Sequence, residues 1–235
     1  MWGEILVEQV KYASAFLATL ILPLVLLYSF VRIMVMQPSY FINVLYSEEY
    51  NLSDRIDLSQ TDTERVLNKL FKYVLGDEES PVVVVKVGDE RVSFYNEREL
   101  VHLEDVKALL EKIRFFMIFI IVFEILMYGF IVRGMPYTIF FKILCTAEII
   151  HIGLVGAILG VANKSMVWFV SLFHRVLFDN NRWILNDATE RLVLLFPKVL
   201  YKEILVNFVA IWFIMMTIIN IFIIVKMRRV TNGNI

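Results

Sequence analysis

Four long apolar stretches constrain this chain more than any other feature of its sequence. They fall within residues 1–36, 114–132, 143–163 and 204–225, and each carries very few charged side chains. A helix needs about 20 apolar residues to cross the hydrocarbon core of a bilayer, so each stretch is long enough to span a membrane. The sequence therefore predicts a membrane protein, mainly α, built on a four-transmembrane-helix bundle.

Bulk composition agrees with this prediction. Of the 235 residues, 59% are hydrophobic, and the mean hydropathy of +0.68 is too high for a soluble domain of this length. The net charge of -1 argues against a nucleic-acid partner. The single cysteine, Cys145, lies inside an apolar stretch, which rules out an intramolecular disulfide.

Four polar segments separate or follow the apolar stretches. Residues 37–113 are long enough for a small domain, 133–142 make a short turn, 164–203 make a longer connection, and 226–235 form the tail. Basic residues in the turn and the tail favour a cytoplasmic location for both, and for the amino terminus. The six basic residues at 164–203 oppose this orientation, but they are interleaved with acidic residues, as on a folded surface. We therefore expect 37–113 and 164–203 on the extracytoplasmic side.

The segment 37–113 is predicted to be a small α+β extracytoplasmic domain. A capping-box spacing occurs at 61–64, and apolar residues follow it at helical intervals until Gly76 ends the run. Two valine-containing runs then flank residues 88–90, which is the pattern of a hairpin. A domain of this size has a small core, so we expect it to depend on the membrane part for stability.

The connection 164–203 contains an unusually apolar run at 165–178. This run is too polar at its ends to be a fifth span and too apolar for bulk water. An interfacial or re-entrant helix fits the pattern, with Trp168 at the headgroup boundary. His174 is then expected near the outer surface of the membrane, and Leu195-Phe196-Pro197 is expected to end or kink a helix.

A second histidine, His102, precedes the predicted span at 114–132. If its helix begins near Asn96, four polar side chains share one face: Arg98, Glu99, His102 and Asp105. The helical rise places His102 close to the headgroup level. The simplest interpretation is a solvated face with weak ion pairs, and for His174 an interfacial side chain with its tip in water.

These residues also resemble a known family. The resemblance is carried by the following residues: Phe94 through His102 to Lys107, Phe173-His174, Phe178-Asp179, Trp183 and Leu195-Phe196-Pro197. They are similar to the lipoprotein intramolecular transacylase family of low-GC Gram-positive bacteria, as is the four-span layout. The resemblance implies that His102 and His174 are the catalytic pair. It also implies an acyltransferase that moves the sn-2 acyl chain of a diacylglyceryl lipoprotein to the α-amine of its terminal cysteine, which leaves a lyso-form lipoprotein.

The same resemblance implies a setting. The protein is expected to be a multi-pass protein of a Gram-positive plasma membrane, with cytoplasmic termini and an extracytoplasmic active site. Its expected partners are the diacylglyceryl lipoprotein and membrane lipid, and no cofactor or metal is expected.

The chemistry of that reaction suits these residue types. The amine must lose a proton and the departing glyceryl oxygen must gain one, and imidazole has a pKa suited to both steps. By spacing, Glu99 and Asp105 are candidates to orient the ring of His102. Arg98, or a donor such as Asn180, is a candidate to face the oxyanion or the glyceryl headgroup.

Three rival classes remain open from the sequence. A zinc site using the histidines with Glu99 or Asp105 lacks the His-Glu-x-x-His spacing. A non-catalytic membrane sensor or assembly protein is the stronger alternative, and it does not require the histidines to meet. A transporter is disfavoured because no internal repeat occurs. We interpret Glu148 and His151, inside 143–163, as hydrogen-bonding groups of the bundle, with Glu124 as a candidate partner and Asn220 bonding between helices.

Overall fold

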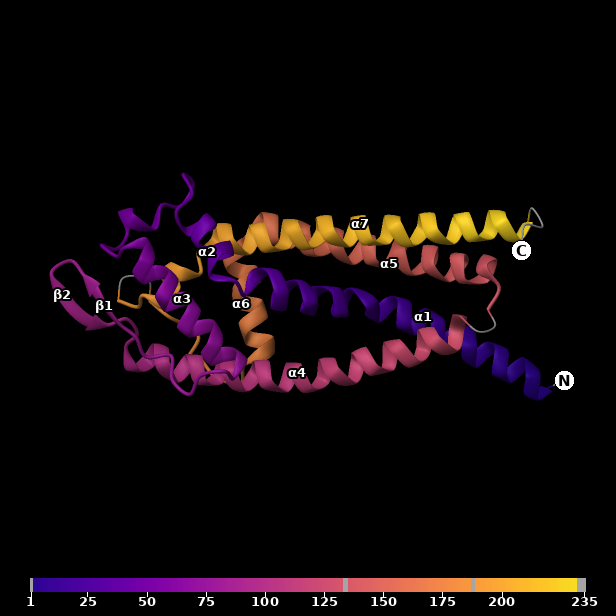
Figure 1. Cartoon of the computed structure of the whole chain (residues 1–235), viewed down its shortest axis with the longest axis horizontal. Coiled ribbons are helices and arrows are strands. Elements are labelled where there is room, and N and C mark those ends of the chain that lie inside the picture. The colour runs from indigo at the N-terminus through magenta and orange to yellow at the C-terminus, as the bar shows by residue number, and fades with distance from the viewer. Residues whose placement is uncertain (1, 133–134, 187–188, 232–235) are drawn as a thin grey trace. The chain divides into compact units, whose positions relative to one another are not determined.

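The computed structural model of the chain describes residues 2–132, 135–186 and 189–231 (Figure 1). The side chains at 4, 130–132 and 227–231 lie outside this description. Parts of the predicted turn (133–134) and of the predicted tail (232–235) therefore lie outside the described residues.

The described chain is mainly helical with one small sheet (Figure 1). Its elements in chain order are α1 (Trp2–Phe30), the π-turn η1 (Val31–Val35), α2 (Pro38–Leu45), the 3-10 turn η2 (Leu52–Asp54), α3 (Gln60–Leu75), β1 (Val84–Val87), β2 (Glu90–Ser93), α4 (Glu97–Val132), α5 (Tyr137–Lys164), α6 (Met166–Leu177), the 3-10 turn η3 (Leu192–Leu195) and α7 (Lys198–Thr231).

The chain divides into two compact units, which we describe separately. Unit 1 comprises residues 1–28, 117–160 and 206–235, and unit 2 comprises 29–116 and 161–205. Unit 1 thus holds most of the length of the apolar helices. Unit 2 holds the predicted polar domain (37–113) and the predicted connection (164–203).

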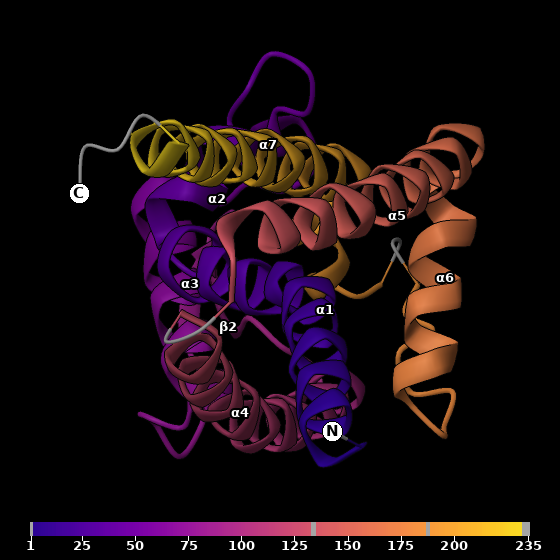
Figure 2. The same ribbon diagram turned by 90° about the vertical axis from the view of Figure 1, so that its right-hand side faces the viewer.

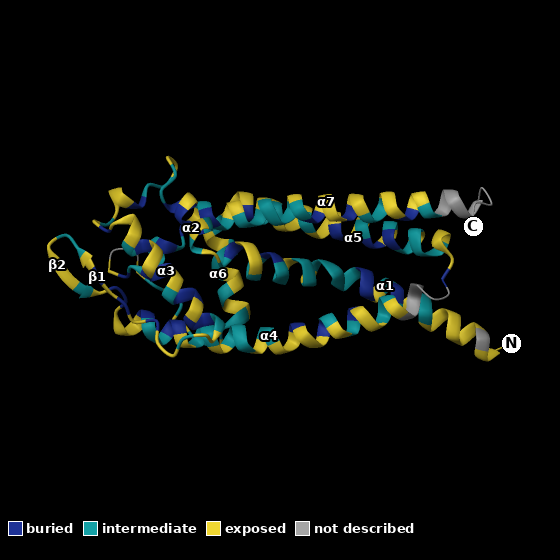
Figure 3. Cartoon of the chain, viewed as in Figure 1, coloured by how far each residue is buried: buried dark blue, intermediate teal, exposed yellow. Residues whose placement is uncertain are grey.

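Apolar side chains hold the helices of unit 1 together. Leu144 on α5 and Trp212 on α7 are buried in one cluster, against which Leu22 of α1 also packs. Figures 1 and 2 show these three helices side by side. Many other large apolar side chains on the same helices are exposed (Figure 3), as expected for surfaces that face lipid rather than water.

Three helical stretches are long and apolar enough to cross a membrane: Ile5–Val35, Tyr137–Lys164 and Leu192–Lys226. They contain the first, third and fourth predicted spans. The second predicted span, 114–132, forms the last part of α4, where Phe119 and Ile125 are strongly exposed. The structure therefore supports the first, third and fourth predicted spans, and the second, at 114–132, stays a prediction.

Polar side chains inside unit 1 connect its helices. The Asn220 amide of α7 donates to the Glu148 carboxylate of α5 at 2.5 Å, and His151 Nε2 lies 3.3 Å from the carbonyl oxygen of Leu20. The prediction that Glu124 is the candidate partner of Glu148 and His151 is wrong, because Glu124 has no hydrogen-bond partner among the described residues. The bond between Asn220 and Glu148 confirms that Asn220 acts between helices.

Unit 2 contains the predicted hairpin. Strands β1 and β2 are antiparallel, with Val84 opposite Ser93 and Val87 opposite Glu90. The turn between them therefore consists of Gly88 and Asp89. Gly88 has φ of +58°, a left-handed conformation that glycine adopts without a steric penalty.

The two predicted polar segments pack into the same unit. Phe41 on α2 contacts the ring of Phe71 on α3 at 4.9 Å and that of Phe196, after η3, at 5.4 Å between centroids. The Tyr50 hydroxyl also donates to the Leu194 carbonyl at 2.8 Å. These contacts add core from the connection 164–203, whereas the sequence predicts that support from the membrane part.

The start of α3 differs from the prediction by two residues. Ser59, not Thr61, is the cap, because the Ser59 hydroxyl accepts the Asp62 N–H at 3.0 Å. Thr63, assigned to the predicted box, is fully buried, with its hydroxyl 2.9 Å from that of Tyr46. The end of α3 agrees with the prediction, since Gly76 caps it in the left-handed conformation.

Substitution of the two candidate caps separates these alternatives. Ser59→Ala removes the acceptor for Asp62 and should destabilise the first turn of α3 by about 1 kcal/mol, which is roughly fivefold faster local hydrogen exchange. Thr61→Ala should leave exchange unchanged. Mass-spectrometric hydrogen exchange of the α3 peptide measures both, and a larger effect from Thr61→Ala would contradict the assignment.

Candidate active site

Unit 2 brings His102 and His174 together. His102 lies on the second turn of α4, and His174 lies near the end of α6. Their ring centroids are 6.1 Å apart, and the ring planes are inclined by 39°. The expectation that the two histidines meet therefore agrees with the geometry of this unit.

Aromatic rings enclose the pair. The ring of His174 stacks on that of Trp183 at 5.1 Å and on that of Phe178 at 5.8 Å. Phe178 also meets His102 edge-on at 5.6 Å. The two imidazoles thus share one apolar surround, which strengthens electrostatic interactions between groups inside it.

The position of α6 fixes one nitrogen of His174. Helix α6 begins after Ser165, whose hydroxyl accepts the N–H of Trp168. The carbonyl oxygen of Val170, one turn before His174, lies 2.8 Å from Nδ1 of the His174 ring. A carbonyl only accepts, so a proton on Nδ1 satisfies this contact. In the neutral ring, Nε2 then carries the lone pair.

His102 is more deeply buried than its partner. Its side chain is 6% exposed, and Nδ1 has no hydrogen-bond partner among the described residues. Burial and, to a smaller extent, the nearby His174 lower the pKa of His102 to about 4, whereas Asp105 opposes the shift. The His102 imidazole is therefore neutral at physiological pH.

Glu99 has a different position from the one its spacing suggested. It forms a capping box with Asn96, in which the Asn96 N–H donates to the Glu99 carboxylate at 2.7 Å and the Glu99 N–H donates to the Asn96 side chain at 2.9 Å. The other carboxylate oxygen accepts the N–H of Leu192 at 2.5 Å. Burial raises the pKa of Glu99, whereas these N–H donors oppose the rise. Glu99 thus joins the start of α4 to η3.

Asp105 ties α4 to the loop that follows α6. Its carboxylate accepts from the Asn180 amide at 3.1 Å and from the Arg182 guanidinium at 3.2 Å. Since Phe178 and Trp183 lie on the same loop, these bonds help to hold the aromatic surround around the histidines. The Asn180 side-chain amide, predicted from the sequence as a candidate donor to the oxyanion or headgroup, thus donates to Asp105.

Arg98 contacts the same loop from the other side. Its guanidinium donates to the Ile184 carbonyl at 2.5 Å and lies 3.6 Å from the buried carboxylate of Glu190. Glu190 also accepts the backbone N–H of Asn186. Arg98 therefore holds the loop, and its side chain remains 55% exposed.

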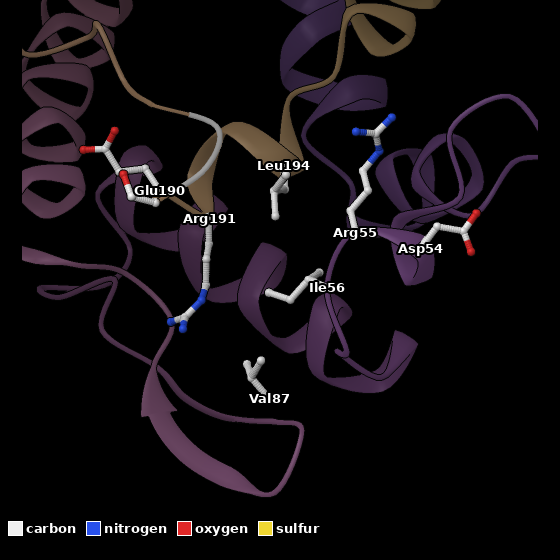
Figure 4. A pocket seen from close by; sticks show the side chains of 8 residues that line it. Asp54, Arg55, Ile56, Val87, Glu190, Arg191 and Leu194 are labelled. Atoms are coloured by element: carbon white, nitrogen blue, oxygen red, sulfur yellow. The ribbon is translucent and has the colours of Figure 1, made fainter.

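Unit 2 also contains two open cavities. One, of about 520 Å³, is lined by Asn96, Glu97, Arg98, Val101, Arg182 and Glu190. The other, of about 510 Å³, is lined by residues of η2, the hairpin and the loop before η3 (Figure 4). Neither is lined by the histidines themselves. The described residues also contain no group of three His, Cys, Asp or Glu side chains able to hold a metal ion.

Sequence reasoning assigned no role to three residues of this site. Phe178 and Trp183 form the ring contacts of the histidines, and Arg182 pairs with Asp105. All three lie within six residues that follow the helix of His174, which is a sequence signal for a role at the site. Their contacts depend on the loop folding back against α4, which the sequence does not indicate.

Fold and site together define a mainly helical membrane protein with a paired-histidine site in its polar unit. The family model of the lipoprotein intramolecular transacylase Lit matches residues 16–201. The chain belongs to this family.

Solved structures of similar fold come from Bacillus cereus. The membrane integral lipoprotein intramolecular transacylase Lit of that organism is 15% identical, with a TM-score of 0.72 over 94% of this chain and 98% of the other. A variant of it with a histidine changed to arginine is 17% identical, with a TM-score of 0.64 over 97% and 96%. At these identities the likeness shows the fold alone. No curated protein is similar enough to this chain to match.

The protonation of His102 gives a prediction for pH dependence. Its ordinary pKa of about 6.5 applies in the unfolded chain, whereas burial lowers the pKa to about 4 in the folded protein. Unfolding therefore takes up a proton between these values, so His102 lowers stability as pH falls from about 6.5 to about 4, with no further effect below.

Ring-nitrogen NMR of protein labelled with ¹⁵N-histidine measures this directly. We expect the His102 signals to remain those of a neutral ring from pH 8 down to pH 5. Assignment uses His102→Gln, and a midpoint near 6.5 for His102 would contradict the predicted burial effect.

Proposed function

We propose that the chain transfers the sn-2 acyl chain of a diacylglyceryl lipoprotein to the α-amine of the lipoprotein's terminal cysteine, giving the lyso form. The observation that carries this proposal is the contact between His102 and His174 inside one aromatic surround. Membership of the Lit family supports the same reaction class.

His174 is the general base in this proposal. With Nδ1 directed at the Val170 carbonyl, Nε2 is available to take the proton that the amine loses as it attacks the ester. The imidazolium that forms keeps its Nδ1 contact. It also lies against the faces of Trp183 and Phe178, which stabilise a cation by about 0.5–2 kcal/mol.

His102 acts as a neutral hydrogen-bond donor. Its low pKa and its closeness to His174 mean that the pair carries one added proton at a time. A neutral ring can donate its N–H to the developing oxyanion throughout the reaction without giving the proton away. In this role its burial is useful, because the donor is fixed before the charge forms.

The proton balance closes within the site. The amine nitrogen forms a bond to the acyl carbon, and the bond from that carbon to the sn-2 oxygen breaks. The proton that moved from the amine to His174 then passes to the departing oxygen, which becomes a hydroxyl. Donor and acceptor belong to one molecule, so no covalent intermediate with the enzyme is required, and proximity contributes up to roughly 7–11 kcal/mol.

The remaining site residues act by positioning. Asp105, with Asn180 and Arg182, holds the loop that carries Phe178 and Trp183. Glu99 fixes the start of α4 one turn before His102. Arg98 holds the same loop through Ile184 and retains further donors for the glyceryl headgroup.

The proposed setting is a Gram-positive plasma membrane, with four spans, cytoplasmic termini and the site on the extracytoplasmic side. The packing of Phe196 on Phe41 supports a common side for the two polar segments. The exposed apolar side chains of α6, including Trp168 and Phe173, support its location at the membrane surface. Membrane lipid and diacylglyceryl lipoprotein are the proposed partners.

Loss of either histidine should abolish product formation in cells. In a host without its own N-acylating enzymes, we expect His102→Ala and His174→Ala to reduce lyso-form lipoprotein by about 10²–10⁴-fold. Mass spectrometry of the lipoprotein's N-terminal peptide measures this. His151→Gln in unit 1 is the matched control, and undiminished product from either site variant would remove that residue from catalysis.

Trp183 should influence the rate through its stack on His174. Trp183→Leu removes the aromatic face beside the imidazolium, so we expect about a 3- to 30-fold lower kcat, whereas Trp183→Phe should recover part of it. Turnover of a purified lipopeptide substrate measures the difference. Equal rates for the Leu and Phe variants would show that the ring face does not act on His174.

A further inference from the structure

The two cavities of unit 2 share a residue. Glu190 lines both, and it is almost fully buried between them. We call the combined lining the polar track; Arg98 and Arg182 belong to the first cavity, Arg55 and Arg191 to the second, and Glu190 to both.

One end of the track lies on the same elements as the histidine pair. Val101 directly precedes His102 on α4, and Arg182 directly precedes Trp183, which stacks on His174. Arg182 is also bonded to Asp105, one turn beyond His102. Arg182 therefore links the track to the residues that surround the histidines.

The other end of the track lies at the second cavity. Figure 4 shows Arg55 and Arg191 on opposite sides of it, with Ile56 and Leu194 between them. Arg55 lies over the ring of Tyr50 at 4.5 Å, and Arg191 donates to the Ser93 carbonyl at 2.9 Å. Each guanidinium carries five donors, so these contacts leave donors available to a ligand.

The track suits an extended polypeptide. Its lining combines charged side chains of both signs with the apolar residues Ile56, Val87, Val101 and Leu194. A peptide backbone presents donors and acceptors in alternation, so it can bond to such a lining. The lining holds four guanidinium groups and three carboxylates, those of Asp54, Glu97 and Glu190. The Glu190 carboxylate is already bonded to Asn186 and close to Arg98. The surplus of donors favours backbone carbonyls and acidic side chains.

We propose that the polar track binds the polypeptide that follows the lipidated cysteine of the lipoprotein substrate. This inference rests on the proposed function, because it takes the lipidated cysteine to sit at the histidines. The track then supplies affinity that grows with peptide length while the lipid is held elsewhere. Such binding depends little on side-chain identity, because it is made largely to the peptide backbone.

Binding of lipopeptides of two lengths tests the proposal. The ligands are fluorescent diacylglyceryl-cysteinyl peptides of two and of ten residues, with an ether in place of the sn-2 ester so that no transfer occurs. Fluorescence anisotropy with the full chain in detergent should show tighter binding of the longer ligand. Equal affinity for the two lengths would overturn the proposal.

Charge reversal locates the effect on the track. Arg55→Glu should weaken binding of the longer ligand about three- to fivefold and leave the shorter ligand unchanged. The matched control is Arg91→Glu, an exposed residue of β2 outside both cavities, which should alter neither. The same loss from both variants would overturn the proposal, because it would reflect overall charge.

Turnover of the corresponding ester substrates separates this inference from the proposed function. Length-dependent binding without conversion by the wild-type chain would support the track and contradict the transacylation. Conversion without any length dependence in binding would support the transacylation and contradict the track.

Discussion

The contact between the rings of His102 and His174 is the interaction on which the account of this molecule depends. Neither helix creates it alone. Residue 102 is held on α4 by the capping box of Asn96 and Glu99, and residue 174 is held on α6 through Val170. The Asp105 carboxylate then draws in the loop that closes the aromatic surround. Residues distant in sequence thus meet in one small volume, where a hydrogen bond to a developing charge is worth more than in water.

The sequence identified the long helices because their signal is local. Twenty consecutive apolar residues have few ways to fold other than as a buried or membrane-spanning helix, so α1, α5 and α7 follow from composition alone. The pairing of the histidines came from a family resemblance. No periodicity in the chain indicates it, because the two histidines lie on different helices, α4 and α6, with the rest of α4 and the whole of α5 between them in the sequence.

Local spacing failed where two physical roles share one pattern. A glutamate three residues before a histidine suits either ring orientation or a capping box, and Glu99 makes the capping box. The true cap of α3, Ser59, precedes a second acceptable cap, Thr61, by two residues. Contacts such as that of Asn180 with Asp105 depend on a chain reversal that sequence spacing does not encode.

If His174 carries the proton while His102 holds the oxyanion in the same transition state, their effects on catalysis must not be independent. The most direct test is a double-mutant cycle on kcat for His102→Ala, His174→Ala and the double variant. We expect the double variant to be about as slow as the slower single variant, since either change disables the same catalytic pair. Rate losses that multiply would show two histidines acting separately, which would contradict the central claim.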